Sequence, residues 1–247
     1  MRNQHQKPYR RTALTAIFLA LALALTACGG GAGGQSVDPP ASDGGGGAGA
    51  DTTLKVGMAT DITSLDYAFN YTYANFQALN SVNNYLLRFD KDGALQPELA
   101  TSWEAVDELT YVYQIRQDAK FSDGTPVTAD DVVFSLNRVK DPALASDLLW
   151  AYKNVQSVEA TGEWEVTVKL STPDATWQYI PATPGGQVTS KAYFEAHKED
   201  FGTADGLTLG SGPYKVDYWK TGSEVGLSRN EYYHGAQPAF EKVVLTV

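Results

Sequence analysis

The sequence is poor in the residues that build covalent cross-links and metal sites. Its 247 residues include one cysteine, Cys28, and three histidines. A single cysteine excludes a disulfide within the chain, so any folded region must be held together by its core. At 43% hydrophobic and 11% aromatic residues, the chain has enough apolar side chains to build one.

Basic residues are also scarce. The chain has 19 lysines and arginines against 29 aspartates and glutamates, a formal net charge of -10. Arg2, Lys7, Arg10 and Arg11 all precede Cys28, so the remainder carries 15 basic against 29 acidic residues, or -14. Phosphate backbones repel an acidic body of this kind, which argues against nonspecific binding to nucleic acid.

Common catalytic motifs are missing as well. The sequence has no HExxH metal motif, no GxSxG and no phosphate-binding loop. A metal site built from His197 and His234 is conceivable, but isolated histidines on polar segments are more often surface residues. We therefore expect no catalytic residue, no bound metal, no cofactor and no enzyme activity.

The first 50 residues differ from the rest. A basic start, an apolar run over 13–25 and Cys28 predict an export signal over residues 1–27, and the run is too short to span a bilayer comfortably. Residues 25–28 resemble the lipobox of bacterial lipoproteins, which implies lipidation of Cys28 and a membrane anchor on the extracytoplasmic face. The alternatives are an ordinary signal peptide with an incidental cysteine, or a buried helix. Residues 28–50 are rich in glycine and predict a flexible linker.

The stretch 121–140 carries the strongest helix signal. Thr128 is a good N-cap and Asp131 stands at N3, as in a capping box; apolar residues then follow at helical spacing until Asp141. Asp130 and Asp131 are neighbours on this helix, so their side chains diverge and cannot flank one scissile bond. We interpret them as helix-capping groups rather than as a catalytic acid/base pair.

Other elements follow from periodicity. Helical spacing predicts helices over 74–86 and from Ser190 to His197. Alternating apolar and polar residues predict strands at 54–58, 111–115 and 242–247, a hairpin turn at 90–93, and a hairpin over 155–170 with Thr167 facing water.

A family resemblance lies in residues 99–103, 111–116 and 120–132. These stretches resemble the signature of the family 5 bacterial solute-binding proteins, the extracytoplasmic receptors of ABC importers for oligopeptides, dipeptides, nickel and related solutes. The resemblance implies an α/β fold: a lobe like that of type II periplasmic binding proteins, with a mixed sheet and a small α+β subdomain at about 88–180. It covers residues 51–247, the front half of a family member, so we expect the second lobe to be absent.

The resemblance also implies ligand-binding positions. Residues 70–73, that is Asn70, Tyr71, Thr72 and Tyr73, occupy the place where the family lays protein along the solute, and the two tyrosines either form an aromatic wall there or pack on their own lobe. Trp150 is a candidate solute contact, with core packing as the alternative. Trp177, in a segment similar to the family's return from the small subdomain, is a further candidate.

Three functions remain open from the sequence. The first is a lipid-anchored binding protein that captures a peptide or other small solute and presents it to ABC permease subunits. The second is a secreted hydrolase of peptide or cell-wall material, and the third is a solute receptor used for signalling. The sequence does not name the solute.

Overall fold

The computed structural model describes residues 52–69 and 71–247. The expected signal, the lipidation site at Cys28, the linker and the candidate contact Asn70 lie outside the described residues. The strands are β1 (Thr53–Gly57), β2 (Leu87–Phe89), β3 (Leu95–Pro97), β4 (Ala100–Ala105), β5 (Thr110–Ile115), β6 (Val155–Gly162), β7 (Glu165–Leu170), β8 (Tyr214–Lys220), β9 (Glu224–Arg229) and β10 (Lys242–Thr246).

The α-helices are α1 (Tyr73–Val82), α2 (Ala129–Lys140) and α3 (Lys191–Ala196). Short 3-10 helices lie between them: η1 (Tyr67–Phe69), η2 (Pro142–Leu144), η3 (Leu149–Tyr152), η4 (Trp177–Ala182) and η5 (Pro184–Gly186).

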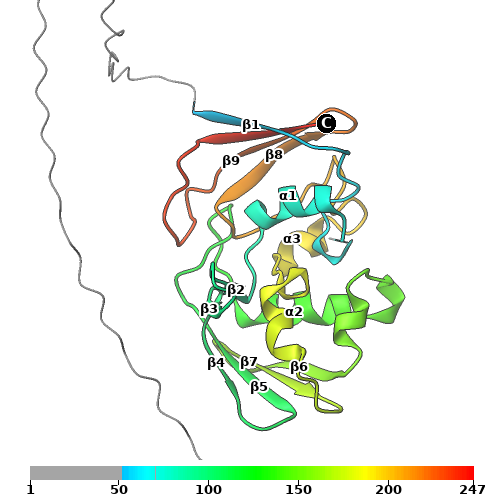
Figure 1. The fold of residues 1–247 in the computed structure, drawn as a ribbon, viewed down its shortest axis with the longest axis vertical. Helices are drawn as coiled ribbons and strands as arrows, with labels where there is room; N and C mark the ends of the chain where they lie inside the picture. The colour runs from blue at the N-terminus through cyan, green and yellow to red at the C-terminus, as the bar shows by residue number, and fades with distance from the viewer. Residues whose placement is uncertain (1–51, 70) are drawn as a thin grey trace, which may run out of the picture. The chain divides into compact units, whose positions relative to one another are not determined.

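One mixed sheet joins the two ends of the described chain. Its strand order is β1-β10-β9-β8, with β1 parallel to β10 and the other neighbours antiparallel. The strands expected at 54–58 and 242–247 are thus confirmed, and they pair with each other. α1 lies along this sheet (Figure 1) and buries Leu79 and Val82 in a core shared with Val225 and Leu245.

A second, antiparallel sheet has the order β4-β5-β7-β6 and is covered by α2. Val132 and Leu136 of α2 share a core with Val158 and Val166 of the β6-β7 hairpin. The expected hairpin is confirmed, but the expectation that Thr167 faces water is wrong. Thr167 is 8% exposed, and its hydroxyl lies 2.8 Å from that of Thr161.

The helix expected over 74–86 ends earlier. Asn83 is extended (φ -106, ψ 140) and its N–H donates to the Leu79 carbonyl, so α1 stops at Val82. Leu86 is buried in the other core, where its N–H donates to the Gly186 carbonyl. The α/β class with a mixed sheet is confirmed, whereas the boundaries 88–180 for a small subdomain stay a prediction. None of the helices in the described part of the chain combines the length and apolar character needed to cross a bilayer.

Candidate functional site

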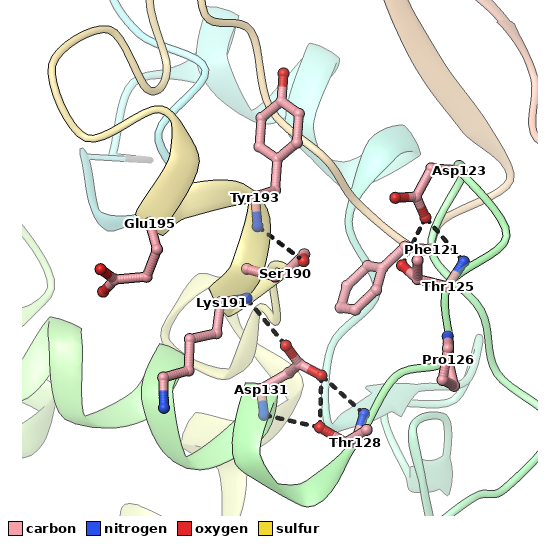
Figure 2. Close-up of a pocket in the computed structure, with 11 residues that line it drawn as sticks. Phe121, Asp123, Thr125, Pro126, Thr128, Asp131, Ser190, Lys191, Tyr193 and Glu195 are labelled. Carbon is pink, nitrogen blue, oxygen red and sulfur yellow. Dashed lines mark hydrogen bonds between the residues drawn. The ribbon is translucent and has the colours of Figure 1, made fainter.

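The capping box at the start of α2 is a structural junction. The Asp131 carboxylate accepts hydrogen bonds from the N–H and hydroxyl of Thr128 (2.9 and 2.6 Å), and Thr128 Oγ1 accepts from the Asp131 N–H. The other carboxylate oxygen of Asp131 accepts from the Lys191 N–H at 2.9 Å, and this bond joins α2 to the first turn of α3 (Figure 2). The interpretation of Asp131 as a capping group is confirmed.

A depression of about 450 Å³ lies beside this junction, between the loop at Phe121 and the side chain of Tyr193. Two polar groups in its wall are already bonded to protein: Asp131 as above, and Ser190 Oγ, which accepts from the Tyr193 N–H as the N-cap of α3. We therefore assign Asp131 and Ser190 to the scaffold.

A buried ion pair fixes the loop that precedes α1. Nη1 and Nη2 of Arg138, on α2, donate hydrogen bonds of 2.7 and 2.6 Å to Oδ1 and Oδ2 of Asp66. The side chain of Arg138 is 11% exposed and that of Asp66 is 6% exposed. The guanidinium also lies over the rings of Phe194 and Phe201, at 4.5 and 5.6 Å. Burial opposes the positive charge, but the Asp66 carboxylate outweighs it and raises the pKa of Arg138 above its ordinary value.

The buried side chains of Tyr67 and Asn75 form hydrogen bonds that stabilise the same loop. The Tyr67 hydroxyl donates to the Ser135 carbonyl at 2.9 Å, and burial raises the pKa of Tyr67. Asn75, fully buried on α1, donates to the Phe69 carbonyl and accepts from the Thr63 N–H. The backbone on both sides of Asn70 is therefore fixed by buried groups.

The next three residues point their side chains away from the core. Tyr71 is 63% exposed and Tyr73 is 78% exposed, so the alternative in which these rings pack on their own lobe does not describe the structure. Thr72 is the N-cap of α1, because its Oγ accepts from the Asn75 N–H at 3.2 Å. Its hydroxyl proton is still available to donate a hydrogen bond.

Trp150 belongs to a neighbouring segment. The Ser146 hydroxyl donates to the Ala68 carbonyl at 2.6 Å, which joins the turn before η3 to η1. Trp150 itself is 59% exposed, so the core-packing alternative is wrong for this residue. Tyr71, Tyr73 and Trp150 thus project from two segments that are bonded to each other.

Trp177 lies inside the protein. It is 1% exposed and meets the ring of Tyr152 edge-on at 5.4 Å between centroids. As placed here it presents no surface to a solute, because the apolar packing of η3 against η4 covers it. The expectation of a Trp177 contact is therefore not supported by this geometry.

The two histidines of the described region each lie beside a different carboxylate. His197 Nδ1 is 3.2 Å from Asp200 Oδ1, and His234 Nε2 is 3.3 Å from Glu98 Oε1. The His234 side chain is 5% exposed, so the expectation that it is a surface residue is wrong. Among residues 52–69 and 71–247, no group of three or more His, Cys, Asp or Glu side chains is placed to hold a metal ion.

Comparison with known proteins decides the family. The sequence model of the family described as "Bacterial extracellular solute-binding proteins, family 5 Middle" matches residues 94–247, which is more than half of the chain. This chain belongs to family 5 of the bacterial extracellular solute-binding proteins. The family membership expected from the three signature stretches is confirmed.

Named relatives within this family agree. The chain is 30% identical over 207 residues to the probable D,D-dipeptide-binding periplasmic protein DdpA of Escherichia coli K12, covering 78% of this chain and 39% of DdpA. It is 28% identical to the oligopeptide-binding protein AppA of Bacillus subtilis 168, covering 96% of this chain and 44% of AppA.

Solved family 5 structures share the fold. AppA from Bacillus subtilis in complex with a nonapeptide is similar with a TM-score of 0.73 and 27% identity, over 79% of this chain and 40% of that one. MoaA from A. tumefaciens R10 in complex with mannopinic acid is similar with a TM-score of 0.73 and 30% identity, over 80% of this chain and 41% of MoaA. The chain therefore spans about two fifths of the length of the family members that it matches.

Sequence reasoning missed the supports of the site. Asp66 lies in the loop before α1, but its partner Arg138 is 72 residues away in the sequence, and no local pattern indicates the pair. The sequence gives no sign of the role of Asn75, because an asparagine inside a helical pattern adds nothing to the apolar periodicity. Exposed Tyr179, at 46%, lies in the segment already compared with the family and could have been found there.

Proposed function

We propose that this chain supplies one face of the solute site in the binding component of an ABC importer, and that the solute is a peptide. The observation that carries the proposal is the exposure of Tyr71, Tyr73 and Trp150 on two bonded segments of a family 5 protein. Tyrosine and tryptophan combine a large apolar surface with a hydrogen-bonding group, as ligand sites require. The relatives named for dipeptide and oligopeptide binding support the choice of solute.

In this proposal the chain binds and does not catalyse. An extended peptide backbone runs along residues 70–73, where the Thr72 and tyrosine hydroxyls donate hydrogen bonds and the solute side chains remain in roomy surroundings. Thr72 keeps its capping bond to Asn75 while donating outward. The remaining length of a family member closes over the solute by a hinge motion and presents it to the permease.

The anchor is part of the same proposal. Lipidation of Cys28 and a linker over residues 28–50 hold the binding unit at the extracytoplasmic face, near a membrane permease, while it turns freely. Replacing Cys28 with alanine releases the protein from the membrane fraction and abolishes labelling by a fatty-acid analogue. If the Cys28→Ala protein stays in the membrane fraction, the proposed lipid anchor is wrong. The proposed peptide-binding function does not depend on that result.

Thermal melting of the full-length polypeptide with a peptide library tests the function. A ligand present at 100 times its dissociation constant stabilises the folded state by about 2.7 kcal/mol, which raises the melting temperature measurably. Peptides of two to nine residues are expected to do so and to be recovered uncleaved. The absence of stabilisation at millimolar peptide, or turnover of the peptide, overturns the proposal, and turnover favours the hydrolase alternative.

A further inference from the structure

The exposed aromatic residues lie in a part of the structure that is almost free of charge. We define the short-helix region as residues 67–73 (Asn70 excepted), 144–152 and 176–187. Its three segments contact one another: Ser146 bonds to Ala68, η1 contacts η5, and the Tyr152 hydroxyl donates to the Gly185 carbonyl at 2.5 Å. Residues far apart in the sequence therefore form one region (Figure 1).

The composition of this region is unusual for the chain. Of its residues only Asp147 is charged, and lysine, arginine and histidine do not occur in it, whereas 19% of the whole chain is charged. Two charged residues border it: Asp66, which is paired with Arg138, and Lys153, which is exposed.

Aromatic rings occupy the exposed positions instead. Tyr71, Tyr73 and Trp150 are 63%, 78% and 59% exposed, and Tyr179 is 46% exposed with its ring stacked on that of Phe89 at 6.3 Å between centroids. Large apolar side chains exposed on segments that are joined to one another are a common mark of an interaction site. Rings of this kind favour offset or edge-on contact with another ring, and a region without a cation offers a carboxylate no partner.

We infer that the short-helix region contacts an uncharged, ring-bearing part of the solute, namely an aromatic side chain of a bound peptide, and that the solute's carboxylate lies elsewhere. This inference rests on the proposed function and goes beyond it by naming which peptides are preferred. Trp150 is the principal contact, because it has the largest ring and lies on η3, next to the turn that joins η1.

Calorimetric titration of the full-length polypeptide tests the inference. The probes are Ala-Ala-Ala, Ala-Glu-Ala, and three tripeptides that carry phenylalanine at each position in turn. We expect at least one phenylalanine peptide to bind about 3- to 10-fold more tightly than Ala-Ala-Ala, in line with the strength of a single aromatic pair. Ala-Glu-Ala is expected to bind no more tightly than Ala-Ala-Ala.

The variants separate the ring contact from general binding. Trp150→Ala is expected to lower the affinity for the phenylalanine peptides to that for Ala-Ala-Ala, while Trp150→Phe retains the preference. Phe240→Ala, which removes another exposed ring outside the region, is the matched control and is expected to change neither affinity.

The outcomes are distinguishable. Equal binding of all five peptides by the wild type, or a preference that survives Trp150→Ala, overturns the ring contact and leaves the peptide-binding function standing. Binding of none of the peptides overturns the function and the inference together. Methyl glucoside is titrated as a further probe. If it binds and none of the peptides does, the exposed rings contact a sugar and the inference is wrong.

Discussion

Arg138 and Asp66 are joined by two parallel hydrogen bonds of 2.7 and 2.6 Å between a helix and a loop that are 72 residues apart in the sequence. Both side chains are almost fully buried, so the pair stands in a low-dielectric setting. It fixes the loop that leads into Tyr71. The stability of the fold and the geometry of the proposed site therefore depend on the same two residues.

Replacing Asp66 with alanine is expected to destabilise the protein by about 3–5 kcal/mol, because it leaves the buried Arg138 charge without its partner. Urea unfolding followed by circular dichroism measures the change. Asp118→Ala is the matched control: Asp118 also accepts two hydrogen bonds from one arginine, Arg116, but is 67% exposed, so the expected loss is less than about 1 kcal/mol. Equal losses in the two variants would contradict the role given to the buried pair.

The N-cap of α2 at Thr128 is expected to contribute to the free energy of unfolding through its hydroxyl. Thr128→Ala removes the hydroxyl that accepts from the Asp131 N–H and is expected to cost about 1 kcal/mol in urea unfolding. Thr128→Ser keeps that hydroxyl and should retain most of the stability. A Thr128→Ser variant as unstable as Thr128→Ala would show that the methyl group matters more than the cap.

The two candidate tryptophans are expected to respond oppositely to truncation. Trp177→Ala empties a buried site against Tyr152 and should destabilise the fold by about 3–5 kcal/mol. Trp150→Ala changes an exposed side chain and should alter the free energy of unfolding by less than about 0.5 kcal/mol. Chemical denaturation of both variants checks this, and a large loss in Trp150→Ala would mean that its ring is buried in solution.

Alkaline pH is expected to weaken the fold through its buried and half-buried tyrosines. Partial burial raises the pKa of half-buried Tyr85 to about 12, and burial also raises the pKa of Tyr113 and of Tyr152. Between about pH 10 and 12 the unfolded chain loses these protons while the folded chain keeps them, so stability is full below pH 10 and falls as the pH rises.

Each such tyrosine contributes a slope of about 1.4 kcal/mol per pH unit in that window. Urea midpoints measured from pH 8 to 12 check the direction. Tyr85→Phe should show a shallower decline than the wild type, by about one tyrosine's slope. A stability that is constant or rises above pH 10 is the contrary result.

Local chemistry made much of the fold predictable. The capping box at Thr128 and Asp131, the β6-β7 hairpin and the Ser190 cap all depend on residues within a few positions of one another. The end of α1 was missed because Leu86 continues the helical spacing, although it packs in a different core. Apolar spacing alone does not reveal which core a residue joins.

The candidate site was predictable in part. The family resemblance pointed to Tyr71, Tyr73 and Trp150, which the structure exposes, and to Trp177, which it buries. Exposure depends on how η3 and η4 pack, and that packing is set by long-range contacts such as Tyr152 with Trp177. The side chain of His234 is likewise buried beside a residue distant in the sequence, Glu98, and local sequence does not indicate that contact.

The parallel pairing of β1 with β10 sets an order on how this sheet can assemble. Thr53 aligns with Lys242, so the first strand has no neighbour until almost two hundred later residues have left the ribosome. Closing so long a loop costs entropy before any pairing offsets it, and non-local strand pairing is slow for that reason. The newly made chain consequently passes through a stage in which an unpaired apolar strand edge is open to chaperones, and to aggregation if they are missing.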